Sequence, residues 1–429
     1  MNPQRIIILN DRSKATGGAT SLALLSARQL ASAGYEVIYV TGDDGSESEL
    51  PEGIELVTLG DRSLLELPFA QQVSKGLYNR AAARLVERVI DRFDTPGTVY
   101  HLHGWAQILS PAALGALSRV EDRLVVHAHD FFHACPNGTY FDFRKEAVCN
   151  LAPLSAACLA TNCDKRSRAQ KVFRTARMLV KDQLLSLRHT RALVAVIHPF
   201  MAEWLVRAGI DPDRIRVVRN PVKPFRPDRV EAERNAEIVF IGRVEEEKGA
   251  DLAAEAARAA GRPLSIIGDG SDRARLAAQY PEITWHGWRS HAEIADLIGS
   301  ARALIMPSRL PEPFGLVALE ALQSGVPLVA FDDSFVAREA AELGCAFLAR
   351  GRHAGSLASA VTELDDDERI EAASRAAFEQ SHALSHTHES WRDGLLDLYR
   401  ELLESEPSVV REPSKSSSTN AGIQQVLSP

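Results

Sequence analysis

The 429-residue sequence has no apolar run long enough to cross a membrane and no excess of positive charge. Its net charge of -8 excludes a general nucleic-acid binder, which needs a basic surface. Residues 1–10 are typical of a strand rather than of a signal peptide. The five cysteines, an odd number, favour a reducing compartment, so we expect a cytoplasmic protein.

Two common phosphate-binding motifs are also missing from the first loop. An apolar strand over residues 5–10 is followed by a loop with Gly17 and Gly18, and then by a helix ending near Gly34. The loop has neither G-x-G-x-x-G nor a P-loop lysine, so it is no dinucleotide or Walker site. The glycine pair still lets the backbone approach a phosphate or a sugar. A plain loop is the alternative interpretation.

Strand-like and helix-like segments alternate along most of the chain, including a long helix expected around residues 77–93. This alternation predicts an α/β protein with doubly wound parallel sheets, and the length favours two domains. The proline-rich stretch 221–229 marks the boundary, giving domains over 1–222 and 223–380. A last helical segment, 381–404, precedes a Ser/Pro-rich tail, 405–429, that we expect to be disordered.

Two predicted strands end in histidines, at His101 and His103 and at His127 and His129. Ligands bind at the carboxyl ends of parallel strands, so these side chains fall where chemistry is expected. His129 is the stronger candidate for a site role. The alternative for each is a buried histidine that only makes hydrogen bonds.

The segment 130–165 contains four of the five cysteines, Cys135, Cys149, Cys158 and Cys163. Their clustering predicts a structural zinc held by four thiolates. None of the pairs has C-x-x-C spacing, so a disulfide, an iron–sulfur cluster or a set of small buried residues are alternatives.

A basic amphipathic helix follows this insert, within residues 165–191. It is either a surface helix that covers the sheet or an interface for anionic lipid headgroups or a lipid-phosphate acceptor. The second interpretation allows peripheral contact with the inner face of a membrane.

The second domain holds the most specific pattern. Arg243 ends a strand, and Lys248 lies five residues later near the next helix, so the two cations can grip a diphosphate. The stretch 306–327, MPSRLPEPFGLVALEALQSGVP, predicts a strand end, a loop with Glu312 and a helix with Glu320. Two carboxylates that bracket a phosphate suit a ligand with hydroxyls on both sides of a diphosphate. A nucleotide sugar is such a ligand.

These motifs together resemble the family 4 retaining glycosyltransferases. The resemblance rests on the E-x7-E spacing of Glu312 and Glu320, on GRVEEEKG and IIGDG, on the Asn-Pro turn at Asn220 and on the early glycine pair. It extends from Arg5 to about Arg400. The insert resembles that of a subset with an HD…CPNG sequence and later cysteines.

The resemblance implies the GT-B fold, in which two Rossmann-like domains face each other across a cleft. The first domain, 1–222, would take a glycan, lipid-linked or other small acceptor. The second, 223–380, would take the nucleotide sugar, and the segment 381–404 would cross back to the first domain.

The resemblance also implies residue roles. Arg243 and Lys248 would bind the donor diphosphate, Glu312 would contact hydroxyls of the transferred sugar, and Glu320 would contact the ribose. His129 would lie near the reacting anomeric carbon. The donor would also meet Gly17 and Gly18 of the first domain and the backbone N–H groups of Phe314, Gly315, Leu316 and Val317.

The expected function is therefore metal-independent sugar transfer with retention, in polysaccharide or glycolipid biosynthesis. The D-x-D strings at Asp211–Asp213 and Asp365–Asp367 do not follow strand ends, which argues against a metal-bound donor. No cofactor is expected for catalysis. The alternatives are a GT-B epimerase acting on a sugar nucleotide and an inactive protein that only binds one.

Overall fold

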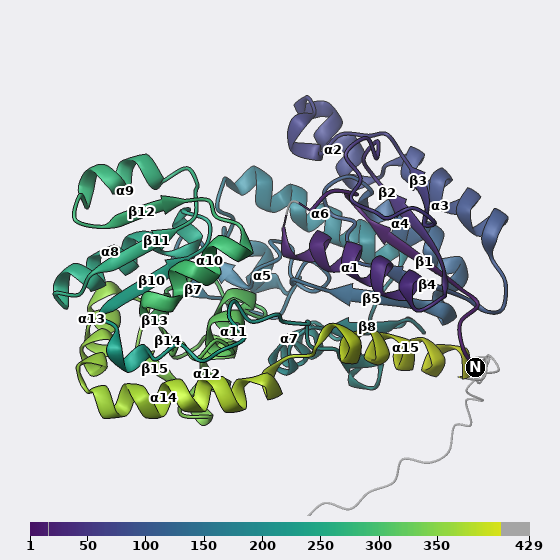
Figure 1. Ribbon diagram of the computed structural model, residues 1–429. Coiled ribbons are helices and arrows are strands. Elements are labelled where there is room, and N and C mark those ends of the chain that lie inside the picture. Colours follow the sequence, from purple (N-terminus) through teal and green to yellow (C-terminus); the bar gives the residue numbers. More distant parts are fainter. Residues whose placement is uncertain (16, 405–429) are drawn as a thin grey trace, which may run out of the picture.

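The computed structural model describes residues 1–15 and 17–404, which form two lobes (Figure 1). The tail 405–429, predicted to be disordered, lies outside these residues. Each lobe is built around one parallel sheet, with seven strands in the first and six in the second. Among the described helices, none is both long and apolar enough to span a membrane.

The first sheet has the order β3-β2-β1-β4-β5-β8-β9, and all its neighbouring strands pair in parallel. Its central strands are fully buried, in keeping with their continuous apolar sequences. The strands are β1 (Arg5–Asn10), β2 (Glu36–Thr41), β3 (Glu55–Thr58), β4 (Thr98–Leu102), β5 (Leu124–Ala128), β8 (Leu193–Val196) and β9 (Ile215–Val217).

Seven helices belong to the described part of the first lobe, and α1 and α6 are the longest. They are α1 (Gly18–Ser32), α2 (Phe69–Leu77), α3 (Arg80–Phe93), α4 (Ser110–Leu117), α5 (Ala156–Ala160), α6 (Arg168–Leu184) and α7 (Pro199–Arg207). The cysteine-containing insert adds a two-stranded hairpin, β6 (Phe141–Asp142) and β7 (Ala147–Val148), before α5.

The long helix expected around residues 77–93 is confirmed as α3, which ends at Phe93 but begins three residues later than expected, after a break that separates it from α2. Helix α2 ends at Leu77, and α3 begins at Arg80. Asn79 explains the break, since its side chain accepts hydrogen bonds from the N–H groups of Ala81 and Ala82 and so caps α3.

The second sheet has the order β12-β11-β10-β13-β14-β15, which repeats the Rossmann-like order of the first. The strands are β10 (Glu237–Ile241), β11 (Leu264–Ile267), β12 (Thr284–Gly287), β13 (Ala301–Met306), β14 (Leu328–Phe331) and β15 (Ala346–Ala349). The helices are α8 (Ala250–Ala259), α9 (Arg273–Gln279), α10 (His291–Leu297), α11 (Leu316–Leu322), α12 (Phe335–Glu342), α13 (Ala354–Thr362) and α14 (Asp367–Gln380). Asp211 and Asp366 of the two D-x-D strings cap helical turns.

The last helix, α15 (His388–Glu404), leaves the second lobe and packs along the first (Figure 1). Its buried side chains, among them Trp391 and Leu395, share an apolar core with Ile6 and Ile8 of β1. The hydroxyl of Tyr399 lies 2.7 Å from Nδ1 of His101 on β4. The helix therefore joins the end of the described chain to the sheet that carries the histidines.

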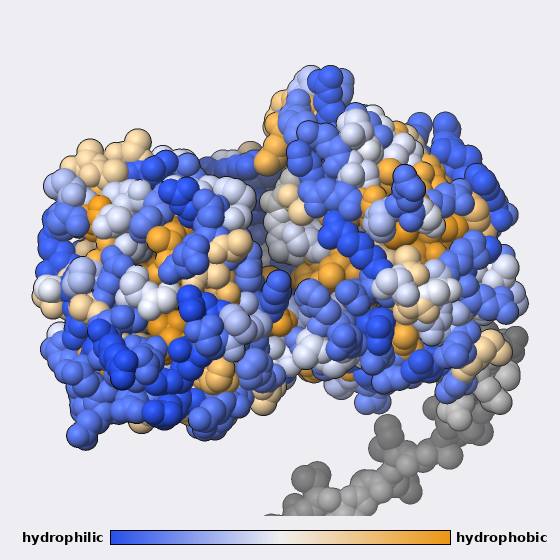
Figure 2. Space-filling view, viewed as in Figure 1, coloured by the Kyte–Doolittle hydropathy of each residue, from blue (hydrophilic) through white to orange (hydrophobic). Residues whose placement is uncertain are grey.

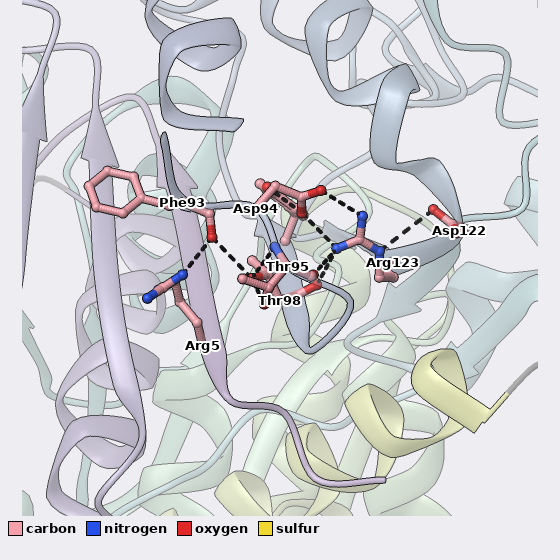
Figure 3. Close-up of polar contacts among 8 residues, drawn as sticks. Arg5, Phe93, Asp94, Thr95, Thr98, Asp122 and Arg123 are labelled. Atoms are coloured by element: carbon pink, nitrogen blue, oxygen red, sulfur yellow. Dashed lines mark hydrogen bonds and ion pairs between the residues drawn. The ribbon is translucent and has the colours of Figure 1, made fainter. Parts of the chain in front are cut away.

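A polar network lies at the amino ends of β4 and β5 (Figure 3). The carboxyl ends of these strands lie on the opposite side of the sheet, toward the cavity. Arg123 donates to both carboxylate oxygens of Asp94, at 2.6 and 3.0 Å, and to the carbonyls of Thr95 and Thr98. Arg5 donates to the carbonyl of Phe93 at 2.6 Å. These contacts fix the turn into β4 and leave its carboxyl end free for a site.

The two lobes are joined by a charged contact between α12 and the first lobe. Glu339 accepts bidentate hydrogen bonds from Arg219, at 2.6 and 2.8 Å, and lies 3.0 Å from Nε2 of His198. Burial raises the pKa of Glu339, but His198 and Arg219 outweigh it and lower the pKa to about 2. The contact holds the second lobe against the end of β9 and the start of α7.

Replacement of Glu339 by glutamine is expected to lower the free energy of unfolding by about 1–3 kcal/mol at neutral pH. The folded-state pKa lies below the ordinary value of 4.5, so the stabilisation is present above that pH and disappears as the pH falls toward 2. Urea unfolding of both proteins across this range measures the difference. Glu342→Gln, an exposed change on the same helix, is the control, and a difference that does not depend on pH would contradict the assignment.

Candidate active site

A cavity of about 350 Å³ lies between the lobes, where the space-filling view shows a hollow (Figure 2). It is bounded by the carboxyl ends of β10 and β13, by the start of α1 and by the end of β5. Eight of the residues predicted from sequence line it: Gly18, His129, Lys248, Glu312, Phe314, Gly315, Leu316 and Val317.

A bidentate ion pair forms the centre of the second-lobe wall. Nζ of Lys248 lies 2.9 and 2.7 Å from the two carboxylate oxygens of Glu312. The hydroxyl of Ser308 donates to the same carboxylate at 3.0 Å. Burial raises the pKa of Glu312, but Lys248 and Ser308 outweigh it and hold the pKa below its usual value. The cavity therefore presents one cation and one ionised carboxylate side by side.

Two glycines allow the loops of this wall to approach each other. Gly249 has φ 74°, and a Cβ there would lie 2.2 Å from the carbonyl oxygen of Pro307. Gly315 has φ 80°, and its Cβ would lie 2.8 Å from a methyl group of Val336. Any other residue at position 249 would push the Lys248 turn away from the loop that carries Glu312. The ion pair thus depends on Gly249, while Gly315 lets the start of α11 approach α12.

His129 faces the ion pair from the first lobe. Its Nε2 lies 2.9 Å from Nδ1 of His103, while its Nδ1 has no partner among the described residues. Burial lowers the pKa of His129 to about 3 and that of His103 well below its usual value, so both rings are neutral at pH 7. His103 thereby fixes the orientation of a neutral ring at the cavity wall.

The neighbouring histidines continue this cluster beneath the cavity. The potential ligand atoms of His101, His103 and His127 lie within 4.8 Å of one another, a spacing that a metal ion could use. Both nitrogens of His101 already have partners, since Nδ1 contacts Tyr399 and Nε2 lies 3.1 Å from Nδ1 of His127. The arrangement is accounted for as a hydrogen-bonded support for His129 and for the docking of α15.

Three predicted residues do not line the cavity. Gly17 precedes α1 as its N-cap. Arg243 is exposed, and its guanidinium lies 2.6 Å from Glu245. Glu320 lies more than one turn into α11, 3.9 Å from Nε2 of His291, and burial raises its pKa to about 8. Their roles in donor binding stay predictions.

Among the lining residues that were not predicted as site residues, three have polar side chains. Asp130 follows His129, and burial raises its pKa to about 6. Asn220 lies in the Asn-Pro turn, and its Oδ1 is buried without a partner in the described chain. Ser308 comes two residues after β13, and that position at a strand end was the available signal.

The cysteines of the insert gather around a buried lysine. Nζ of Lys171 lies 3.5 Å from Sγ of Cys158 and 3.4 Å from Sγ of Cys163. Sγ of Cys135 lies 3.1 Å from Oδ1 of Asn137, and all four thiols are free. Within residues 1–15 and 17–404, no three cysteine sulfurs lie within 4.8 Å of one another. Zinc binding stays a prediction, and it requires Lys171 to move from between the thiols.

Two family models match consecutive parts of the chain. Residues 16–226 match Glycosyltransferase Family 4, and residues 222–381 match Glycosyl transferases group 1. The chain belongs to the family 4 glycosyltransferases. The predicted family is confirmed, and the cavity lies where the two matched regions meet in space.

Structural similarity confirms the predicted GT-B fold of this family 4 member. Sucrose-phosphate synthase from Thermosynechococcus elongatus aligns with a TM-score of 0.69 and 17% identity, over 93% of this chain and 99% of that one. HepE from Anabaena, solved in complex with UDP, aligns with a TM-score of 0.61 and 17% identity, over 92% and 100%. At this identity the similarity concerns the fold alone.

Curated relatives match only in part. Glycogen synthase of Mycobacterium tuberculosis is 31% identical over 221 residues, which are 48% of this chain and 51% of that protein. D-inositol 3-phosphate glycosyltransferase of Corynebacterium urealyticum is 28% identical, over 46% and 54%. The chain thus spans about half the length of the curated relatives it matches.

Glu320→Gln is expected to stabilise the protein at about pH 8, by roughly 1–3 kcal/mol, while it weakens nucleotide binding. The folded-state pKa of Glu320, about 8, exceeds its ordinary value of 4.5. The wild-type protein therefore loses stability as the pH rises from 4.5 to 8, because the buried carboxyl group must ionise. Thermal unfolding near both ends of this range measures the effect. Glu342→Gln is again the control, and a variant that is less stable than wild type at the higher pH would contradict the burial argument.

Proposed function

We propose that the protein transfers a sugar from a nucleoside-diphosphate donor to an acceptor, with retention of the anomeric configuration and without a metal ion. The observation that carries the proposal is the half-buried ion pair of Lys248 and Glu312, which lines the same cavity as His129. A cation beside an ionised carboxylate matches a ligand that presents phosphate oxygens next to sugar hydroxyls.

The chemistry follows from where charge develops. When the bond between the anomeric carbon and the phosphate oxygen breaks, negative charge grows on the leaving diphosphate and positive charge on the sugar ring. Lys248 stabilises the former from a fixed position, because Gly249 and Pro307 hold its turn. The cation takes the part that a metal ion has in other transferases.

Glu312 accepts hydrogen bonds from hydroxyls of the transferred sugar in this proposal. When the diphosphate engages Lys248, the carboxylate is released from its partner and can accept new donors. His129 is neutral and lines the cavity, so it can contact the sugar without adding charge beside the developing cation. The acceptor oxygen attacks from the side of the leaving group, and its proton passes to the leaving phosphate oxygen.

Two carboxylates are among the described residues that line the cavity. Glu312 is paired with Lys248, and Asp130 accepts a hydrogen bond from the N–H of Phe132, so neither is assigned as a nucleophile. Retention is therefore assigned to front-face attack, and a trapped glycosyl-enzyme would contradict that step. Relatives with the names glycogen synthase and inositol phosphate glycosyltransferase differ in acceptor, so the family alone leaves the acceptor open.

We also propose peripheral contact of α6 with an anionic membrane surface. Val172 and Leu179 are exposed on this helix, at 62% and 50%. Its Lys171, Arg177 and Lys181 are buried, so the cations that would meet an anionic surface are the exposed Lys165, Arg166 and Arg168 at its start. Leu65 and Phe69 are exposed, at 63% and 77%, on the neighbouring segment that leads into α2. A lipid-linked acceptor would reach the cavity from this side, and cytoplasmic location remains part of the same proposal.

The purified protein is expected to release nucleoside diphosphate from one of UDP-, GDP- or ADP-glucose in the presence of EDTA. Lys248→Met and Glu312→Gln are each expected to reduce the rate by about 10²–10³-fold, because each removes a charge matched to the transition state. Lys145→Met, an exposed lysine outside the cavity, is the control. An enzyme-coupled assay for the released nucleoside diphosphate measures the rate.

Three results would overturn this proposal. Loss of activity with EDTA that returns with magnesium would remove metal independence. Binding of a nucleotide sugar without hydrolysis or transfer to any acceptor would favour the inactive binding protein, and recovery of an epimerised sugar nucleotide would favour the epimerase.

A further inference from the structure

A second cavity, of about 430 Å³, lies entirely within the first lobe. It shares Ala19, His129 and Asp130 with the cavity between the lobes, so the two spaces meet at His129. A molecule held in the first-lobe cavity therefore has one end beside the transferred sugar. Its volume suits a small glycan unit rather than a long chain.

Four arginines line this cavity: Arg12, and Arg166, Arg174 and Arg177 from α6 and the residues before it. Arg177 is 9% exposed, and one of its N–H groups donates to the carbonyl of Ala106. Its Nε has no hydrogen-bond partner, and it forms no ion pair within the part of the chain that the structure describes. Burial lowers the pKa of Arg177 to about 10, which leaves it charged at pH 7. A buried guanidinium with an unused donor is costly unless a ligand completes it.

Two further arginines lie at the same wall. Arg166 is exposed, and its side chain has no ion-pair partner among the described residues. Arg174 lies 3.3 Å from Asp164 and donates to the carbonyl of Asn137. Of the three, Arg174 forms an ion pair with a carboxylate, whereas the charge of Asp11 acts on Arg177 without an ion pair or hydrogen bond between them in the described chain.

The acidic groups of the cavity are already satisfied. Asp11 accepts hydrogen bonds at 2.7–2.8 Å from three consecutive backbone N–H groups, residues 107–109. Glu66 lies 3.8 Å from Arg12. Asp130 accepts from the N–H of Phe132, and burial raises its pKa to about 6. The unmet charge in the cavity is positive.

Aromatic rings accompany these cations. The guanidinium of Arg177 lies 4.9 Å from the ring of Trp105, and that of Arg174 lies 6.0 Å from the ring of Phe132. Phe173 also lines the cavity. Rings of this kind pack against the apolar faces of sugars, while the arginines suit a phosphate or carboxylate group.

We propose that the first-lobe cavity binds the acceptor through an anionic group, a phosphate or a carboxylate on a sugar ring, held by Arg177 and Arg166. The proposal rests on the proposed function, because it names the class of acceptor for the same site. The anionic end lies at the arginines and the attacking hydroxyl lies at His129. A soluble sugar phosphate and a glycolipid headgroup share this chemistry.

Glucose 6-phosphate is the probe, with glucose as its neutral match, and calorimetric titration of the full chain measures binding. The experiment uses the Lys248→Met background, so that the donor cavity does not take up phosphate. Glucose 6-phosphate is expected to bind at least about tenfold more tightly than glucose, since charge-assisted hydrogen bonds account for that much. Equal binding of the two sugars would overturn the proposal.

Variants identify the arginines. Arg177→Met keeps the aliphatic packing on Trp105 and is expected to weaken binding of glucose 6-phosphate at least about tenfold, and Arg166→Gln about threefold. Arg168→Gln, an exposed change on the same helix outside the cavity, leaves binding unchanged. Arg177 is buried, so Arg177→Met could fail to fold. Arg166→Gln changes an exposed residue, so it tests the assignment in that case as well. Equal weakening by Arg166→Gln and Arg168→Gln would overturn the assignment.

Vesicles distinguish the two sources of the anion. If vesicles of phosphatidylcholine with phosphatidylglycerol displace glucose 6-phosphate and pure phosphatidylcholine does not, the headgroup of a lipid is the acceptor class. If neither displaces it, a soluble acid sugar is the acceptor class. Failure of anion binding with intact hydrolysis of a nucleotide sugar would overturn this inference alone, whereas anion binding without any hydrolysis would leave it standing and remove the proposed function.

Discussion

The ion pair between Lys248 and Glu312 is the contact on which the rest of the site depends. Each charge lies in a partly buried wall and would be costly alone, so the two loops that carry them are held together by their mutual attraction. Gly249 supplies the backbone conformation that this approach requires. A diphosphate that replaces the carboxylate at Lys248 can use a loop geometry that already exists, so little reorganisation accompanies binding.

The site exists only while the two lobes keep their relative placement. His129 reaches the cavity from the end of β5 and is hydrogen-bonded to His103. These two rings pack on His127 and His101, and His101 is hydrogen-bonded to Tyr399 of α15. The helix that crosses back therefore contacts the support of the catalytic face as well as the apolar core. The contact of Glu339 with Arg219 fixes the other side of the junction. Both the stability of the fold and the geometry of the site depend on these few polar contacts.

Most of the two parallel sheets could be predicted from the sequence, because apolar strands bounded by glycine and proline have a strong local signal. Lys248 and Glu312 were found from their positions after strands. Their direct contact was not, since 64 residues separate them and only the folded sheet brings them together. The same limit applies to Arg177, whose burial depends on α6 packing against Trp105. The start of α3 was placed three residues early, because the helical pattern of residues 69–77 leads into it and only the cap at Asn79 marks the boundary.

The most direct test measures, by calorimetry, the binding of two ligands. One is the intact nucleotide sugar that the protein accepts among UDP-, GDP- and ADP-glucose, and the other is the corresponding nucleoside diphosphate. The account predicts that Lys248→Met weakens both ligands about tenfold or more, because both carry the diphosphate. Glu312→Gln should weaken only the nucleotide sugar, and the diphosphate should bind at least as tightly as before, since Lys248 is then unpaired. Equal weakening of both ligands by Glu312→Gln would contradict the assignment of the carboxylate to the sugar.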